Sequence, residues 1–145
     1  MLVVDTNVLI YAADRDSQFH SPCRKWLERR RAGAETWYTT WAILYEFLRV
    51  VTHPRVMRNP WAALEAWGFV AALLASPGLG VLVATDRHPE IAALVIKELP
   101  HLAGNLVHDA HTAILMREHG VRRICTRDTD FHEFPFLEVI DPLHV

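Results

Sequence analysis

The sequence predicts an α/β fold with a central parallel sheet of four to five strands and helices on both faces. A chain of 145 residues that is 51% hydrophobic and 22% charged has the size and composition of one globular domain, which we expect to span residues 1–145. The apolar run Val3-Val4 ends at Asp5 and passes directly into a helical segment. Later strand-like and helix-like segments alternate in the same way, as they do in parallel sheets.

The expected elements follow this alternation along the chain. Thr6 and Asn7 suit the first strand-to-helix turn, because their side chains can accept hydrogen bonds from free N–H groups at a helix start. Ser21-Pro22 is typical of a helix start and Gly120 of a helix end. We expect helices over residues 7–13, 21–33, 41–52, 59–75, 88–99 and 105–119, strands over 3–4, 81–83, 122–126 and 137–140, and a brief extended or capping piece over 36–40.

Composition and charge exclude several classes of protein. The net charge of −2 gives no overall attraction to nucleic acid, so any such attraction must be local. Cys23 and Cys125 form no disulfide framework and fit a reducing cytosol, so we expect a cytoplasmic protein without a signal peptide. Residues 66–85 carry no charge, but Ser-Pro-Gly-Leu-Gly at 76–80 interrupts them, and we expect a helix, a turn and a strand instead of a membrane span.

Four acids lie at strand ends or in helices. Asp5 and Asp128 each follow a strand, and the plain alternatives are a helix cap for Asp5 and an Asp-rich turn for Asp128. Glu46 lies in a helix that is apolar almost all round, where a carboxylate is costly to bury unless it pairs, for example with Arg49, or binds a metal. Asp109 lies one turn into a later helix, where the helix dipole also favours an acid.

An α/β sheet would bring these four acids to one edge. Carboxylates about 5 Å apart repel by roughly 3 kcal/mol per pair at an effective dielectric of 20. Such a group must therefore hold protons or divalent cations. Oxygen ligands select Mg²⁺ or Mn²⁺ over zinc, so the set predicts a magnesium or manganese site.

Five features of the sequence, taken in order, match a known family. They are Asp5-Thr6-Asn7-Val8-Leu9-Ile10-Tyr11, a lone Glu46 in a mid-chain helix, His108-Asp109-Ala110-His111, Thr126-Arg127-Asp128-Thr129-Asp130-Phe131, and the ending from Phe134-Pro135 to Asp141-Pro142. In these features the sequence resembles a PIN-domain ribonuclease and, within that group, a VapC-type toxin of a toxin–antitoxin pair. The resemblance covers nearly the whole chain, although residues 53–104 match no motif.

The resemblance implies a metal-dependent endoribonuclease that uses one or two Mg²⁺ or Mn²⁺ ions. The catalytic and metal-binding residues would be Asp5, Glu46, Asp109 and Asp128, with Thr6, Asn7, Thr126 and Asp130 in support. It also implies RNA as the substrate and a small antitoxin of the VapB type as a partner. The apolar helix expected over residues 60–75 motivates a homodimer.

Other residues carry weaker predictions. Arg127, His108 and His111 are candidate substrate contacts, whereas the basic residues between 24 and 31 fit a solvated helix face better. Two other functions stay open. One is a non-catalytic PIN-like module that binds RNA or protein. The other is a metal-independent ribonuclease in which His108 and His111 act as base and acid.

Overall fold

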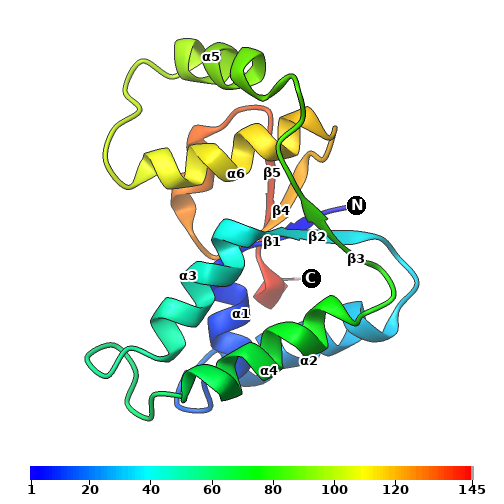
Figure 1. The fold of residues 1–145 in the computed structure, drawn as a ribbon, viewed down its shortest axis with the longest axis vertical. Coiled ribbons are helices and arrows are strands. Elements are labelled where there is room, and N and C mark those ends of the chain that lie inside the picture. The colour runs from blue at the N-terminus through cyan, green and yellow to red at the C-terminus, as the bar shows by residue number, and fades with distance from the viewer. Residues whose placement is uncertain (145) are drawn as a thin grey trace.

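The computed structural model describes residues 1–144 and contains a five-stranded sheet whose neighbouring strands are all parallel. The strand order is β3-β2-β1-β4-β5 (Figure 1). The strands are β1 (Val3–Val4), β2 (Trp37–Thr40), β3 (Leu79–Leu82), β4 (Arg123–Cys125) and β5 (Glu138–Ile140). The predicted parallel α/β sheet is thus confirmed.

Helices cover both faces of the sheet. Figure 1 shows α5 and α6 above the sheet and α1 to α4 below it. The α-helices are α1 (Thr6–Ala13), α2 (His20–Ala32), α3 (Trp41–Val51), α4 (Ala63–Leu74), α5 (His88–Glu98) and α6 (Leu106–Glu118), and two 3-10 helices are η1 (Thr129–Glu133) and η2 (Pro142–His144). No helix among residues 1–144 combines the length and the apolar composition that a membrane crossing requires.

The centre of the sheet is the best-buried part of the fold. Val3 and Val4 of β1 are fully buried, and Ala113 and Met116 of α6 are buried with them. Burial of an aliphatic side chain of this size contributes about 1.5–3 kcal/mol. The very short β1 is therefore held firmly, although only two residues form it.

The order in which the parallel strands are added changes direction between β1 and β4. From β1 it builds outward through β2 to β3, and it then returns to place β4 on the other side of β1. Val4 pairs with Cys125, and the backbone N–H of Asp5 donates to the carbonyl of Cys125 at 3.0 Å. Ligands of open parallel sheets bind at such a reversal, outside the carboxyl ends of the strands. Asp5 and Thr126 both lie at that edge.

Several predicted boundaries differ from the structure. The piece over 36–40 is the full strand β2, next to β1, whereas the strand expected over 81–83 begins at Leu79 and lies at the sheet edge. Helix α2 begins at His20, and the hydroxyl of Ser17, rather than Ser21, accepts from the backbone just before it. Helix α4 begins at Ala63, since the N–H of Trp61 donates to the carbonyl of Val51 instead of starting the helix.

Candidate active site

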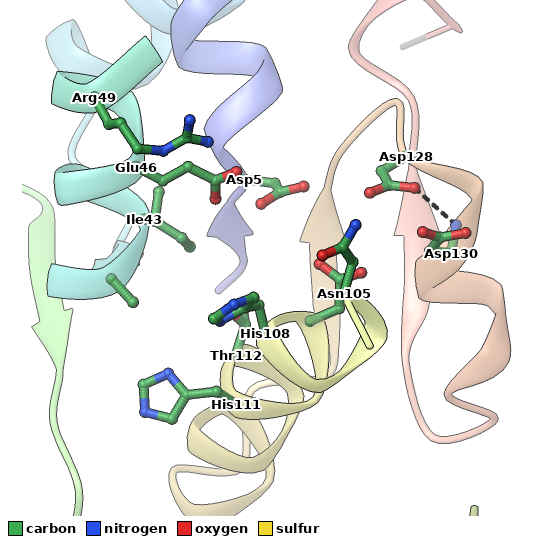
Figure 2. A pocket seen from close by; sticks show the side chains of 12 residues that line it. Asp5, Ile43, Glu46, Arg49, Asn105, His108, His111, Thr112, Asp128 and Asp130 are labelled. Atoms are coloured by element: carbon green, nitrogen blue, oxygen red, sulfur yellow. Dashed lines mark hydrogen bonds between the residues drawn. The ribbon is translucent and has the colours of Figure 1, made fainter. Parts of the chain in front are cut away.

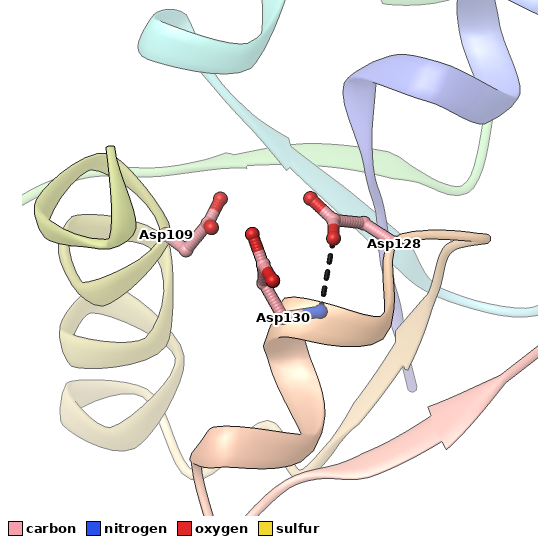
Figure 3. A group of neighbouring side chains, drawn as sticks. All are labelled: Asp109, Asp128 and Asp130. Atoms are coloured by element: carbon pink, nitrogen blue, oxygen red, sulfur yellow. Dashed lines mark hydrogen bonds between the residues drawn. The ribbon is translucent and has the colours of Figure 1, made fainter. Parts of the chain in front are cut away.

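A cavity of about 730 Å³ lies between α3 and α6, over the carboxyl ends of β1 and β4. Five carboxylates line it. They are Asp5, Glu46, Asp109, Asp128 and Asp130. Figure 2 shows four of them, on α3 and in the turns after β1 and β4, and Figure 3 shows the fifth on α6. The fold therefore brings the four acids singled out in the sequence into one cavity and adds a fifth.

Asp5 is held at the end of β1 as the N-cap of α1. One carboxylate oxygen accepts from the backbone N–H of Thr6 at 2.8 Å, and the other accepts from the Thr126 hydroxyl at 2.8 Å. Burial raises the pKa of Asp5 to about 6, against the lowering effect of these hydrogen bonds, and repulsion by Glu46 and Asp128 adds to the rise. The helix-cap reading of Asp5 is thus correct, but the cap also faces the cavity.

Asn7 and Thr126 tie the turn after β1 to the turn after β4. The Asn7 amide donates to the Thr126 hydroxyl at 2.9 Å and to Asp5 at 3.3 Å, while its carbonyl oxygen accepts from the backbone N–H of Arg127 at 3.1 Å. The same Thr126 hydroxyl accepts from the backbone N–H of Asp128 at 2.9 Å. One buried hydroxyl therefore orients acids from two strands.

Three acids converge at the α6 side of the cavity. One carboxylate oxygen from each of Asp109, Asp128 and Asp130 lies within 4.8 Å of the others (Figure 3). Asp128 also accepts from the backbone N–H of Asp130 at 2.9 Å. Burial raises the pKa of Asp109 to about 7, with further contributions from Asp128, Asp5, Asp130 and Glu46. Asp130, which the sequence placed only in support, contributes directly to this cluster.

Glu46 lies on the exposed side of α3. The apolar residues Ile43, Leu44 and Phe47 are buried on the other side, so the apolar neighbours of Glu46 in the sequence do not bury its carboxylate. Glu46 accepts from the Thr6 hydroxyl at 3.1 Å. Within residues 1–144 it forms no ion pair with Arg49, the alternative partner that the sequence offered.

The candidate substrate contacts separate into two groups. His108 and His111 of α6 line the cavity, and burial followed by repulsion from His88 lowers the pKa of His111. Arg127 does not line it, because its guanidinium lies 4.2 Å over the Phe19 ring and within 3.3 Å of Asp141. These two contacts hold the Arg127 side chain outside the cavity, although its neighbour Asp128 lines the cavity.

Three further polar residues line the cavity that the sequence did not single out as site residues. Arg49 follows Glu46 by three positions and Thr112 follows Asp109 by three, while Asn105 precedes Asp109 by four. On a helix this spacing places side chains on the same face. Helical spacing from the acids was the signal that could have identified them.

The carboxylates gather at the carboxyl ends of the central strands of a parallel sheet, so the protein is an α/β protein with an acidic site. Comparisons with known proteins identify its family. Residues 2–137 match the PIN domain, so the chain belongs to the PIN-domain family. It is also 34% identical over 139 residues to the ribonuclease VapC48 of Mycobacterium tuberculosis, covering 95% of this chain and 94% of that one. Within the PIN-domain family, the chain is therefore a VapC-type ribonuclease homologue, which confirms the resemblance.

Two solved structures share the fold. VapC20 of Mycobacterium tuberculosis, a toxin that cleaves the sarcin-ricin loop, superposes with a TM-score of 0.66 at 19% identity, covering 97% of this chain and 100% of that one. VapBC2 of Rickettsia felis, bound to a DNA fragment from its promoter, superposes with a TM-score of 0.67 at 15% identity, covering 96% of each chain.

Proposed function

We propose that residues 1–145 form a single nuclease domain, the endoribonuclease toxin of a VapBC-type pair, which hydrolyses RNA phosphodiester bonds with one or two Mg²⁺ or Mn²⁺ ions. The observation that carries the proposal is the convergence of carboxylates in one cavity, three of them within 4.8 Å of one another. The metal-binding residues are Asp5, Glu46, Asp109 and Asp128, and Asp130 lies close enough to take part.

The residues present fit a hard divalent cation. The converging donors are all carboxylate oxygens, which suit Mg²⁺ or Mn²⁺. The raised pKa values of Asp5 and Asp109 mean that protons partly neutralise the site near neutral pH when no cation is bound. When bound, the ion would supply a water of lowered pKa and an electrophilic anchor for the scissile phosphate.

The protein's own side chains orient the acids and release protons. Thr126 and Asn7 hold Asp5, Thr6 holds Glu46, and the Thr126 hydroxyl fixes the backbone of Asp128. Binding of a cation requires ionised carboxylates, so Asp5 and Asp109 give up their protons as it binds. The hydrogen bonds keep the remaining oxygens aimed at the cavity, which preorganises the site before RNA arrives.

A second candidate is histidine-based cleavage. It is supported by one observation, the position of His108 and His111 in the same cavity. We favour the carboxylate site, because two histidines on a helix need no catalytic explanation, whereas five carboxylates around one cavity do. For the same reason we favour the carboxylate site over a non-catalytic binding module.

We propose two protein partners. The Rickettsia felis structure is described as VapBC2 on promoter DNA, and by likeness we expect a VapB-type antitoxin to cover the cavity of this chain. A homodimer would use α4, where Leu64 is 83% and Trp67 42% exposed. With RNA as the proposed substrate, we expect a cytoplasmic location.

Purified protein incubated with total RNA tests this proposal. Cleavage should require Mg²⁺ or Mn²⁺, stop with EDTA, and be abolished by Asp5→Ala. Asp86→Asn, an exposed acid outside the cavity and outside α4, should cleave like wild type. Cleavage that survives both EDTA and Asp5→Ala would exclude the carboxylate site. Mapping RNA 5′ ends after a brief induction in cells would then identify the RNA.

A further inference from the structure

A stripe along α3 is exposed beside the cavity. Trp41, Tyr45 and Arg49 recur every fourth residue, so they lie on one face of the helix. Trp41 is 41% and Tyr45 63% exposed, and their rings lie 6.4 Å apart with 50° between their planes. Ala42 and Glu46, which flank this stripe, line the cavity. The exposed aromatic rings are therefore continuous with the acidic site.

Arg49 ends the stripe with an unpaired positive charge. Among the cavity-lining residues that the structure describes, it is the one arginine or lysine. Its guanidinium makes no ion pair or hydrogen bond within residues 1–144, and Glu46 accepts from Thr6. Figure 2 shows the Arg49 side chain reaching over Glu46 toward Asp5. A free guanidinium suits the bidentate binding of a phosphate.

We propose that α3 is the wall of the cavity along which single-stranded RNA binds, with Arg49 on a backbone phosphate and the Trp41–Tyr45 pair stacked on a nearby base. This inference rests on the proposed ribonuclease function and assigns substrate-binding residues to it. Trp41 and Arg49 are about 12 Å apart along the helix axis, at 1.5 Å per residue. That length exceeds the roughly 3.4 Å advance of one stacked nucleotide, so the stripe can hold more than one.

The position of Arg49 beside two aromatic rings supports RNA as the ligand of this stripe. The chain has a net charge of −2 and the cavity is lined by carboxylates, so a polyanion needs a local cation at the site. Arg49 provides it next to two rings, the combination that binds single strands without strong sequence preference. A duplex keeps its bases stacked on each other, so the aromatic pair selects unpaired RNA.

Binding of a fluorescein-labelled, mixed-sequence single-stranded RNA, followed by anisotropy in Ca²⁺ across a salt series, tests the arginine. Arg49→Gln should weaken binding and reduce the slope of log K against log salt by about 0.7, the value for one lost phosphate contact on a single strand. Arg55→Gln, an exposed arginine outside the cavity, is the matched control and should leave the slope unchanged. Equal slopes for Arg49→Gln and wild type overturn the assignment.

Alanine variants test the aromatic pair. Trp41→Ala or Tyr45→Ala should weaken single-stranded RNA binding about fivefold or more, with little effect on a duplex of the same sequence. Leu94→Ala, which is 42% exposed on α5 and outside the cavity, is matched to Trp41 in exposure and should bind RNA like wild type. Equal weakening by Trp41→Ala and Leu94→Ala contradicts the proposal.

Light scattering on the same variants separates RNA binding from a protein interface. Trp41→Ala should keep the wild-type molecular mass, and a fall in mass would make the stripe a subunit interface and overturn the inference. Metal-dependent cleavage of total RNA by the wild type distinguishes a failure of the ribonuclease proposal from a failure of the α3 inference. Its absence refutes the ribonuclease proposal, whereas its presence with normal RNA binding by all α3 variants refutes this inference alone.

Discussion

Replacing Asp109 by Asn should stabilise the metal-free protein at alkaline pH. The pKa of Asp109 is about 7 in the fold, against an ordinary 3.8, so the folded state binds more protons than the unfolded state between these values. Stability therefore falls as pH rises through this window, and the full penalty applies above about pH 7. Asn carries no charge, so the variant lacks this penalty.

The magnitude follows from the pKa difference. At 1.36 kcal/mol per unit, the rise from 3.8 to about 7 sets an upper limit of roughly 4 kcal/mol. Asp109 is only half-buried, so solvent and salt screen the repulsion, and we expect about 1–2 kcal/mol. For a domain of this size that is a rise in melting temperature of about 2–8 °C.

Thermal and urea denaturation in EDTA, at about pH 5 and about pH 8, measures this effect. Asp109→Asn should exceed wild type by only part of this amount near the lower pH, which lies inside the window, and by the full amount near the higher one. Asp86→Asn, an exposed acid outside the cavity, should follow wild type at both. Parallel pH dependence of wild type and Asp109→Asn would refute the reasoning, because it would mean that Asp109 carries no electrostatic penalty.

Three further predictions concern the metal, the buried hydroxyl and the dimer. Mn²⁺ should raise the melting temperature of wild type more than that of Asp128→Asn, and equal shifts would remove Asp128 from the metal site. Thr126→Val should lower the cleavage rate about 10- to 100-fold and stability by about 1–3 kcal/mol. Thr39 has a buried hydroxyl without a partner in the described residues, so Thr39→Val should lower neither the cleavage rate nor the stability. Equal losses in Thr126→Val and Thr39→Val would count against the hydrogen-bond network. Light scattering should give twice 16.6 kDa for wild type and 16.6 kDa for Leu64→Asp, while a monomeric wild type would exclude the dimer.

The ends of these strands were predictable because an apolar run, which indicates a buried strand, stops there at an acid or a polar residue. Val3-Val4 followed by Asp5 identifies a buried strand and its acidic end, and the same holds for the strand before Asp128. Glu46 could be assigned to a helix but not to its exposed side. The face that a helix buries depends on what packs against it, and nearly every neighbour of Glu46 in the sequence is apolar.

Side-chain orientations that depend on contacts between distant parts of the chain could not be predicted from the sequence. Arg127 is adjacent to Asp128, yet its guanidinium is held by Phe19 and Asp141, contacts that only the folded chain creates. Asp130 was predicted to support the site, and it joins the converging cluster because η1 turns it toward Asp109. Such details depend on turn geometry and on tertiary contacts that local patterns do not encode.

The chemistry of the cut RNA ends tests the central claim most directly. Attack by water activated at the carboxylate site leaves a 5′-phosphate and a 3′-hydroxyl, and a 2′-O-methyl group at the cleaved bond does not block the chemistry. Catalysis by His108 and His111 would use the RNA 2′-hydroxyl as nucleophile and leave a 2′,3′-cyclic phosphate and a 5′-hydroxyl. We expect 5′-phosphate ends from wild type, with at most a modest loss of rate in His108→Ala and His111→Ala. EDTA-resistant cleavage that leaves cyclic phosphate ends would contradict the account.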